Sequence, residues 1–147
     1  MVPKKFKVII GVRGLSFDSA NYTLGVSEKC LNLHGHTFSV SVEVLGEIRD
    51  DTGMVLDFSL LKKHIKEIIE EYDHKVLLPK GHTKSTIIKG LFRTEIKELD
   101  YSHATTEYIA LELAKRLYER IKMPLRLKLF EGMNNYVIIE IGEWNKT

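Results

Sequence analysis

The stretch Thr37-Phe38-Ser39-Val40-Ser41-Val42-Glu43-Val44-Leu45 determines how the rest of this sequence is interpreted. Apolar and polar side chains alternate along it without a break, and residues two apart in an extended chain point to the same side. One side therefore carries Phe38, Val40, Val42 and Val44. We expect a β-strand over residues 37–45 with this apolar side buried.

Strands are also predicted near both ends of the sequence. The predicted ranges are Lys5–Arg13, Leu125–Glu131 and Tyr136–Glu143. The last two flank Gly132-Met133-Asn134-Asn135, a plausible hairpin connection. Ser16–Leu33 has no helical stripe, and we expect the end of a strand followed by a long loop there.

Two segments have the apolar spacing of amphipathic helices. The first is expected over 59–71 with Asp57 or Ser59 as N-cap; the second starts at Thr105 or Thr106 and ends before Pro124. Residues 73–103 show no convincing period, and so a loop of about 30 residues is predicted, a length typical of functional or flexible segments.

The predicted order is β-β-α-α-β-β in a single domain, residues 1–147. This order favours an α+β fold, a four-stranded antiparallel sheet with both helices on one face. Such a sheet has two open edges, which a soluble protein must cover or pair. We therefore expect a homo-oligomer.

Composition narrows the functional classes. Of the 147 residues, 22 are basic, 20 are acidic and 44% are hydrophobic. No block of like charge stands out. This balance argues against a nucleic-acid binder, and no apolar run is long enough for a membrane helix. With no secretory signal and only one cysteine, Cys30, we expect a cytoplasmic protein without an intrachain disulfide.

His34-Gly35-His36 is a candidate metal site. Both imidazoles point to the same side of an extended chain, so both can reach one ion. Cys30 lies four residues before His34, either as a zinc ligand or as a nearby acid or base. A polar surface pair without a metal is the alternative.

Two further positions carry carboxylates of interest. Asp73 precedes His74 and could orient the imidazole and raise its basicity, although an ordinary polar helix exit is the alternative. Glu131 is in phase with the leucines of strand 125–131. A carboxylate on that apolar face needs a partner, which is either a basic side chain or a ligand with paired N–H donors.

These pieces occur in an order that resembles a known family. The stretches are Phe17-Asp18-Ser19-Ala20-Asn21, Cys30-x3-His34-Gly35-His36, Gly53-Met54-Val55-Leu56-Asp57-Phe58, Asp73-His74, Thr105-Thr106-Glu107 and Phe130-Glu131. Together they resemble the 6-pyruvoyl-tetrahydropterin synthase family, including its 6-carboxy-tetrahydropterin synthase branch. The resemblance implies the tunnelling fold, in which trimers stack as a homohexamer and active sites lie between subunits.

The resemblance also implies roles for the candidate residues. His34 and His36 would hold Zn²⁺, which acts as a Lewis acid on the substrate's hydroxyls. Cys30 would transfer protons, with Asp73 and His74 as its relay from a neighbouring subunit.

The substrate implied is 7,8-dihydroneopterin triphosphate, which loses triphosphate in the reaction. Glu131 would bind the pterin, while Thr105, Thr106 and Glu107 would help to seat its ring. The short Cys-x3-His-Gly-His spacing is more similar to the 6-carboxy branch, which feeds 7-deazaguanine (queuosine or archaeosine) synthesis. 6-Pyruvoyl-tetrahydropterin is the alternative product.

The sequence departs from the family pattern at Asn21, where the family has a third zinc-binding histidine. Asparagine is a poor zinc ligand, so either its oxygen coordinates the ion or a water fills the position. A catalytically weakened pterin-binding oligomer is therefore the rival hypothesis. The retained Cys30, Asp73, His74 and Glu131 favour an active enzyme. The segment Lys80–His103 also looks longer than is usual in the family.

Overall fold

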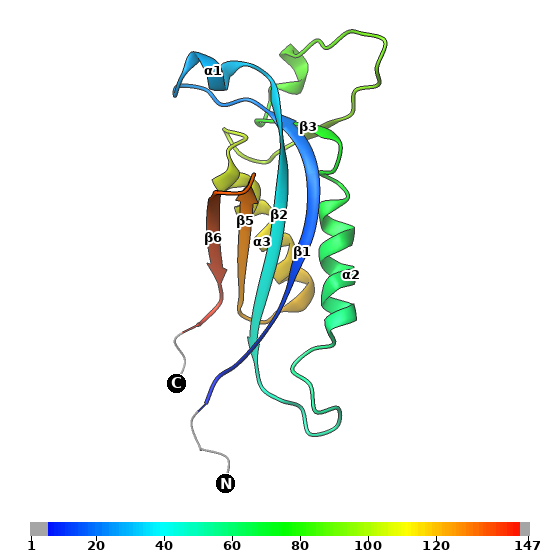
Figure 1. Ribbon diagram of the computed structural model, residues 1–147, viewed down its shortest axis with the longest axis vertical. Coiled ribbons are helices and arrows are strands. Elements are labelled where there is room, and N and C mark those ends of the chain that lie inside the picture. The colour runs from blue at the N-terminus through cyan, green and yellow to red at the C-terminus, as the bar shows by residue number, and fades with distance from the viewer. Residues whose placement is uncertain (1–5, 145–147) are drawn as a thin grey trace.

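The computed structural model describes residues 6–144, which form a curved mixed sheet with helices packed on one side (Figure 1). The strands are β1 (Val8–Asn21), β2 (His34–Gly46), β3 (Lys75–Leu78), β4 (Ile96–Glu98), β5 (Leu125–Glu131) and β6 (Asn135–Ile141). The helices are α1 (Glu28–Leu31), α2 (Phe58–Ile69), α3 (Thr106–Ile121) and a short 3-10 helix, Thr83–Ser85. The sheet order is β4-β3-β1-β2-β5-β6.

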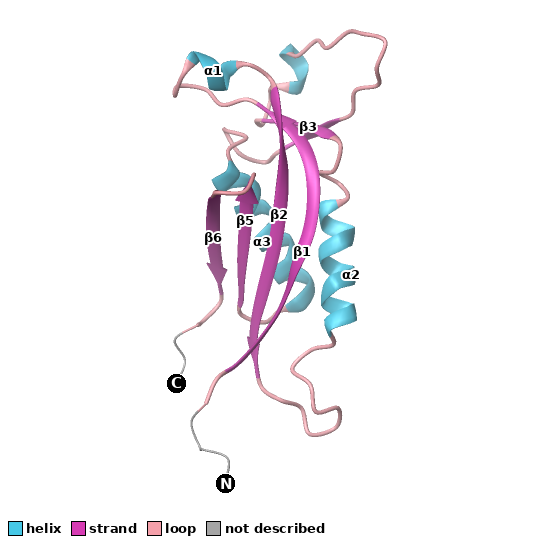
Figure 2. Ribbon diagram, viewed as in Figure 1, coloured by secondary structure: helices cyan, strands magenta, loops and turns pink. Residues whose placement is uncertain are grey.

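The prediction of a four-stranded, wholly antiparallel sheet is wrong. Six strands are present among the described residues, and β3 and β4 add parallel pairs beside β1. Both strands lie in the segment 73–103 that was expected to be a loop. Each has four residues or fewer, too short for a period to appear in the sequence. Figure 2 shows that most of the remaining segment is loop.

The first strand is longer than predicted and changes sides along its length. Lys5 lies outside the described residues, and β1 continues past Arg13 to Asn21, well into the stretch predicted as the end of a strand followed by a long loop. Its register against β2 shifts between Val12 and Leu15, and Gly14 has a φ of 84°. This is a β-bulge. Because of it, even-numbered residues face the core before Gly14 and odd-numbered residues after it.

Both long helices cover the same face of the sheet, as predicted. Phe38, Val40, Val42 and Val44 are almost fully buried on this face. Side chains of α2 and α3, such as Ile65 and Leu113, lie around Val40. The opposite face carries no helix in Figure 1 and is called the open face below.

Each long helix begins at a side-chain cap. Asp57, one of the two predicted N-caps of α2, accepts a hydrogen bond from the Ser59 N–H at 2.7 Å. Thr105 accepts from the Tyr108 N–H at 3.3 Å at the start of α3. The first helix ends at Ile69, slightly before the predicted end. No helix among residues 6–144 has the length and apolar character needed to cross a membrane.

A buried polar network fixes the segment around β3 and β4 to the helices. The Tyr72 hydroxyl donates to the carboxylate of Glu112, a residue of α3 that is only 9% exposed. The same carboxylate accepts the Asp100 N–H at 3.1 Å, and Arg116 donates to the Tyr72 oxygen at 3.2 Å. Burial, reinforced by Glu112, raises the pKa of Tyr72, so its hydroxyl remains a donor.

The bulge yields a stability prediction. Gly14→Ala should lower the free energy of unfolding by roughly 1–2 kcal/mol, because an L side chain disfavours the left-handed conformation. A Cβ at Gly14 meets no atom within 4 Å, so this cost is conformational rather than steric. Urea unfolding would measure it. The control is Gly35→Ala, whose Cβ makes only an ordinary contact at 3.5 Å. Equal stability of the two variants would contradict the assignment.

Candidate metal and pterin site

The end of β1 and the start of β2 lie side by side and bring the predicted metal ligands together. Asn21 lies directly opposite His34 in the strand register, and Ser19 lies opposite His36. Directly opposed residues of an antiparallel pair place their side chains on the same face. His34, His36 and Asn21 therefore share the helix-covered face of the sheet, just beyond Phe38.

The two histidines are positioned to act as a pair. Their ring centroids lie 4.7 Å apart, with the ring planes at 84°. His34 Nδ1 lies 2.7 Å from the Asn32 carbonyl oxygen. Since a carbonyl oxygen only accepts, Nδ1 carries the proton, and Nε2 keeps a lone pair for an ion. Metal-binding histidines typically donate a hydrogen bond of this kind from the ring nitrogen that does not bind the metal.

Asn21 has one satisfied and one unsatisfied polar end. The side chain is 2% exposed, and its Nδ2 donates to the Ala104 carbonyl at 2.7 Å. Its Oδ1 is buried and has no hydrogen-bond partner among the described residues. Such an atom costs about 1–3 kcal/mol unless a ligand satisfies it. Two imidazoles and this amide oxygen put three donor atoms on one face of the sheet, and the two imidazoles are of the kind that zinc prefers.

Glu131 faces the same end of the sheet. The Thr106 hydroxyl donates to its Oε1 at 2.9 Å, and His36 Nε2 lies 3.6 Å from the same oxygen. Its side chain is 26% exposed. The second oxygen, Oε2, accepts no hydrogen bond from residues 6–144 and remains available to a ligand.

Thr105, Thr106 and Glu107 surround the start of α3. Thr106 contacts Glu131, whereas the Thr105 hydroxyl caps the helix and Glu107 is exposed in its first turn. Of these three described side chains, Thr106 is the one that hydrogen-bonds to another predicted site residue.

Asp73 and His74 form an ion-pair dyad beside β1. Asp73 Oδ1 lies 2.9 Å from His74 Nδ1 and also accepts the Asp18 N–H at 2.9 Å. His74 has a φ of 60°, and its N–H donates to the Asp18 carbonyl at 2.6 Å. The bond from the Asp18 N–H, aided by His74, holds the pKa of Asp73 below its usual value. The carboxylate thus stays charged and orients the imidazole.

Cys30 lies apart from this dyad within the chain. It is half-buried in α1, and its backbone N–H donates to the Ser27 hydroxyl at 3.2 Å. Among residues 6–144, the one group of three His, Cys, Asp or Glu side chains that could share an ion is Asp18, Asp73 and His74. The sequence assigned no role to Asp18. No pattern in the sequence pointed to Asp18, because its role depends on the β1–β2 register and on residues distant in the chain.

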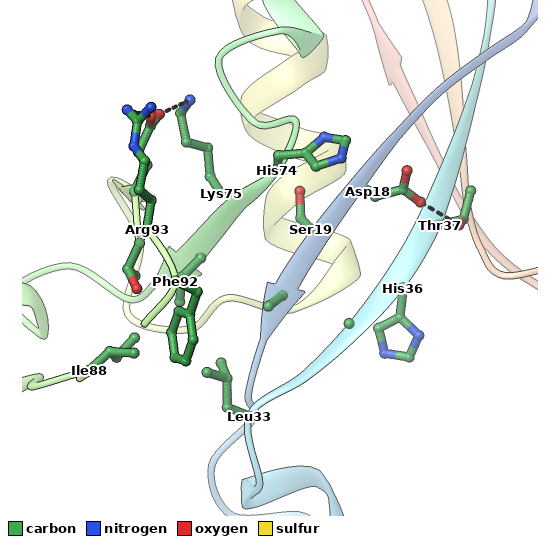
Figure 3. Close-up of a pocket in the computed structure, with 15 residues that line it drawn as sticks. Asp18, Ser19, Leu33, His36, Thr37, His74, Lys75, Ile88, Phe92 and Arg93 are labelled. Atoms are coloured by element: carbon green, nitrogen blue, oxygen red, sulfur yellow. Dashed lines mark hydrogen bonds and ion pairs between the residues drawn. The ribbon is translucent and has the colours of Figure 1, made fainter. Parts of the chain in front are cut away.

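A pocket of about 510 Å³ opens beside these residues. His36 and His74 line it, as do Leu33 and Phe92 from two separate loops (Figure 3). Arg93 also belongs to the wall, so the long segment between β3 and β4 shapes the pocket.

Comparison with known proteins now assigns the family. Residues 11–141 match the family described as 6-pyruvoyl tetrahydropterin synthase. The chain belongs to the 6-pyruvoyl tetrahydropterin synthase family. A Methanocaldococcus jannaschii protein provisionally named a 6-carboxy-5,6,7,8-tetrahydropterin synthase is 45% identical over 123 residues, covering 74% of this chain and 75% of the relative.

Two further likenesses agree. A Pyrococcus abyssi protein with the same provisional name is 32% identical over 139 residues, or 85% of each chain. The crystal structure of 6-pyruvoyl tetrahydropterin synthase from Plasmodium vivax gives a TM-score of 0.76 at 19% identity, covering 95% of this chain and 100% of that one. The latter likeness concerns the fold alone. The predicted family is confirmed, as is the tunnelling fold of the single chain, and family membership implies a lyase-type enzyme.

The dyad yields a pH-dependent prediction. Asp73→Asn removes the charge but keeps an oxygen to accept the Asp18 N–H. Because the folded-state pKa of Asp73 is lowered, its carboxylate stabilises the fold above the unfolded-state pKa of about 3.9. The variant should therefore be less stable at pH 7, by under about 1 kcal/mol, because a side chain 39% exposed is screened by solvent.

The difference should narrow as the pH falls from about 4 toward 2, where wild-type Asp73 also becomes neutral. Urea unfolding at pH 7, 5 and 3 measures this trend, with the distant Asp50→Asn as the matched control. A stability difference independent of pH would contradict a role for the Asp73 charge.

Proposed function

We propose that the protein is a zinc-dependent lyase that converts 7,8-dihydroneopterin triphosphate to 6-carboxy-5,6,7,8-tetrahydropterin with release of triphosphate. The observation that carries the proposal is the approach of Glu131 to His36, with 3.6 Å between Oε1 and Nε2. This approach supports a site in which the carboxylate proposed to bind the pterin lies beside the proposed metal ligands. The names of the archaeal relatives support the carboxy product.

Each group then has a chemical task. Zinc held by His34, His36 and Asn21 would supply Lewis acidity toward the hydroxyls of the substrate side chain. Glu131 would accept two N–H bonds from the amino-pyrimidine edge of the pterin, a charge-assisted fork. Thr106 already holds one oxygen of this carboxylate in place.

Proton transfer falls to Cys30 and to the Asp73–His74 dyad. With its Nδ1 on Asp73, His74 leaves Nε2 free to take or give a proton. Its side chain is 78% exposed, so a substrate or a neighbouring subunit can approach it. Within one chain, Cys30 does not belong to the cluster of side chains around the dyad. This favours a site assembled between subunits.

We also propose that the chain forms a homohexamer, because the sheet of the single chain has edges that other copies could pair. Among residues 6–144, β3 pairs with β1 only at Ser19 and Ala20, so most of that edge of β1 has no strand partner there. β6 forms the other end of the sheet. Unpaired edges of this length require covering, and copies of the chain can pair them.

The rival function is a pterin-binding oligomer with weakened catalysis. Asn21 is the observation that favours it, because an amide oxygen is a weaker zinc ligand than an imidazole. 6-Pyruvoyl-tetrahydropterin synthase activity is a second alternative, and the mass of the product distinguishes it from the carboxy product.

Metal analysis combined with turnover tests the zinc assignment. Purified protein should contain about one zinc ion per chain and release triphosphate from 7,8-dihydroneopterin triphosphate. Asn21→His should bind zinc more tightly in a chelator competition, because it restores a third imidazole. The control is Asn32→His, an exposed position on the same end of the molecule. Zinc-loaded protein without turnover, both native and Asn21→His, would contradict the lyase and favour the pterin-binding alternative.

Substitution of Glu131 tests the pterin contact. Glu131→Gln keeps the shape but loses the charge, so kcat/KM should fall roughly 10- to 100-fold, the value of a charge-assisted hydrogen bond. Binding of a non-reactive pterin should weaken by a similar factor, as measured by calorimetry. Glu140→Gln on β6 is the matched control. Unchanged pterin affinity in Glu131→Gln would exclude Glu131 from the pterin site.

A further inference from the structure

Asp18 joins the Asp73–His74 dyad through its backbone and also through its side chain. Its N–H donates to Asp73 Oδ1 at 2.9 Å, and its carbonyl accepts the His74 N–H at 2.6 Å. These two bonds belong to the main chain and would persist with any residue at position 18. The side chain adds a third element, because it points to the open face of β1, where the dyad lies.

A cross-strand hydrogen bond holds the Asp18 carboxylate in place. Thr37 lies opposite Asp18 in the β1–β2 register, and its hydroxyl donates to Asp18 Oδ1 at 2.5 Å. One oxygen of Asp18, one of Asp73 and one ring nitrogen of His74 lie within 4.8 Å of one another. An exposed carboxylate is thus tethered next to an imidazole that already has a carboxylate partner.

We propose that Asp18 is a positioning residue that acts through His74. Its negative charge stabilises the imidazolium that forms when His74 accepts a proton, so it keeps His74 an effective base. Asp73 orients the ring by direct contact, whereas Asp18 acts by charge across a short gap. The inference rests on the proposed function for its catalytic consequence, but not for its effect on His74 itself.

Other charges around His74 do not replace this effect. Lys75 is adjacent on β3, and its ammonium is paired at 2.6 Å with Glu95, which Arg93 also contacts at 3.1 Å. His36 lines the same pocket from β2. These groups remain the same when Asp18 is changed, so a comparison of variants isolates the Asp18 charge.

The test is Asp18→Asn, which keeps the size, the backbone bonds and an acceptor for Thr37. NMR titration of the His74 imidazole in the unliganded protein should show its midpoint moved to lower pH by roughly half a unit to one unit, as one charge at this separation in a water-like dielectric produces. The acid limb of kcat/KM should move in the same direction, and high salt should reduce both shifts. Asp50→Asn, the same charge change at the far end of the molecule, should move neither.

Thr37→Val provides a second variant, which keeps the charge but releases the tether. It should give a smaller shift in the same direction. An unmoved His74 midpoint in both variants overturns the inference. Activity of Asp18→Asn that returns on adding Zn²⁺ or Mg²⁺ would make Asp18 a metal ligand and would also overturn it. Absence of turnover in the wild type would contradict the proposed lyase. The NMR titration of His74 would still test the effect of the Asp18 charge in that case.

Discussion

The pairing register of β1 against β2 is the constraint on which the site depends. The bulge at Gly14 shifts this register by one residue, and beyond it Asn21 faces His34 while Asp18 faces Thr37. A slip of one residue would exchange the two faces of the strand. Asn21 would then leave the histidines, and the Asp18 carboxylate would enter the apolar core. One backbone irregularity thus sets both the arrangement of the proposed metal ligands and the surroundings of the dyad.

The same strand pair divides the chemistry between two sides of the sheet. The proposed metal ligands and Glu131 share the helix-covered face, whereas Asp18 and Thr37 lie on the open face beside the dyad. Among residues 6–144, the buried Asn21 Oδ1 has no hydrogen-bond partner. Natural proteins tolerate such local costs at functional sites. The proposed site would be completed by a ligand on one side and a neighbouring subunit on the other.

Sequence reasoning succeeded where a period was long enough to be detected. The strand around Val40, both long helices and the position of Glu131 on the face of β5 followed from alternation or helical spacing. β3 and β4 were missed because they are short and pair in parallel with strands distant in the sequence. The second half of β1 was missed because the bulge interrupts its alternation. The position of Asp18 beside the dyad emerged only from the strand register, since Asp73 lies 55 residues further along the chain and His74 follows it.

The metal assignment is the central claim, and X-ray absorption spectroscopy at the zinc edge tests it most directly. Zinc-loaded protein should show two imidazole nitrogens and otherwise oxygen ligands, with no sulfur. Asn21→Ala should change the oxygen shell and leave the imidazole signal unchanged. A zinc–sulfur distance near 2.3 Å would make Cys30 a ligand instead of a proton carrier and would contradict this account.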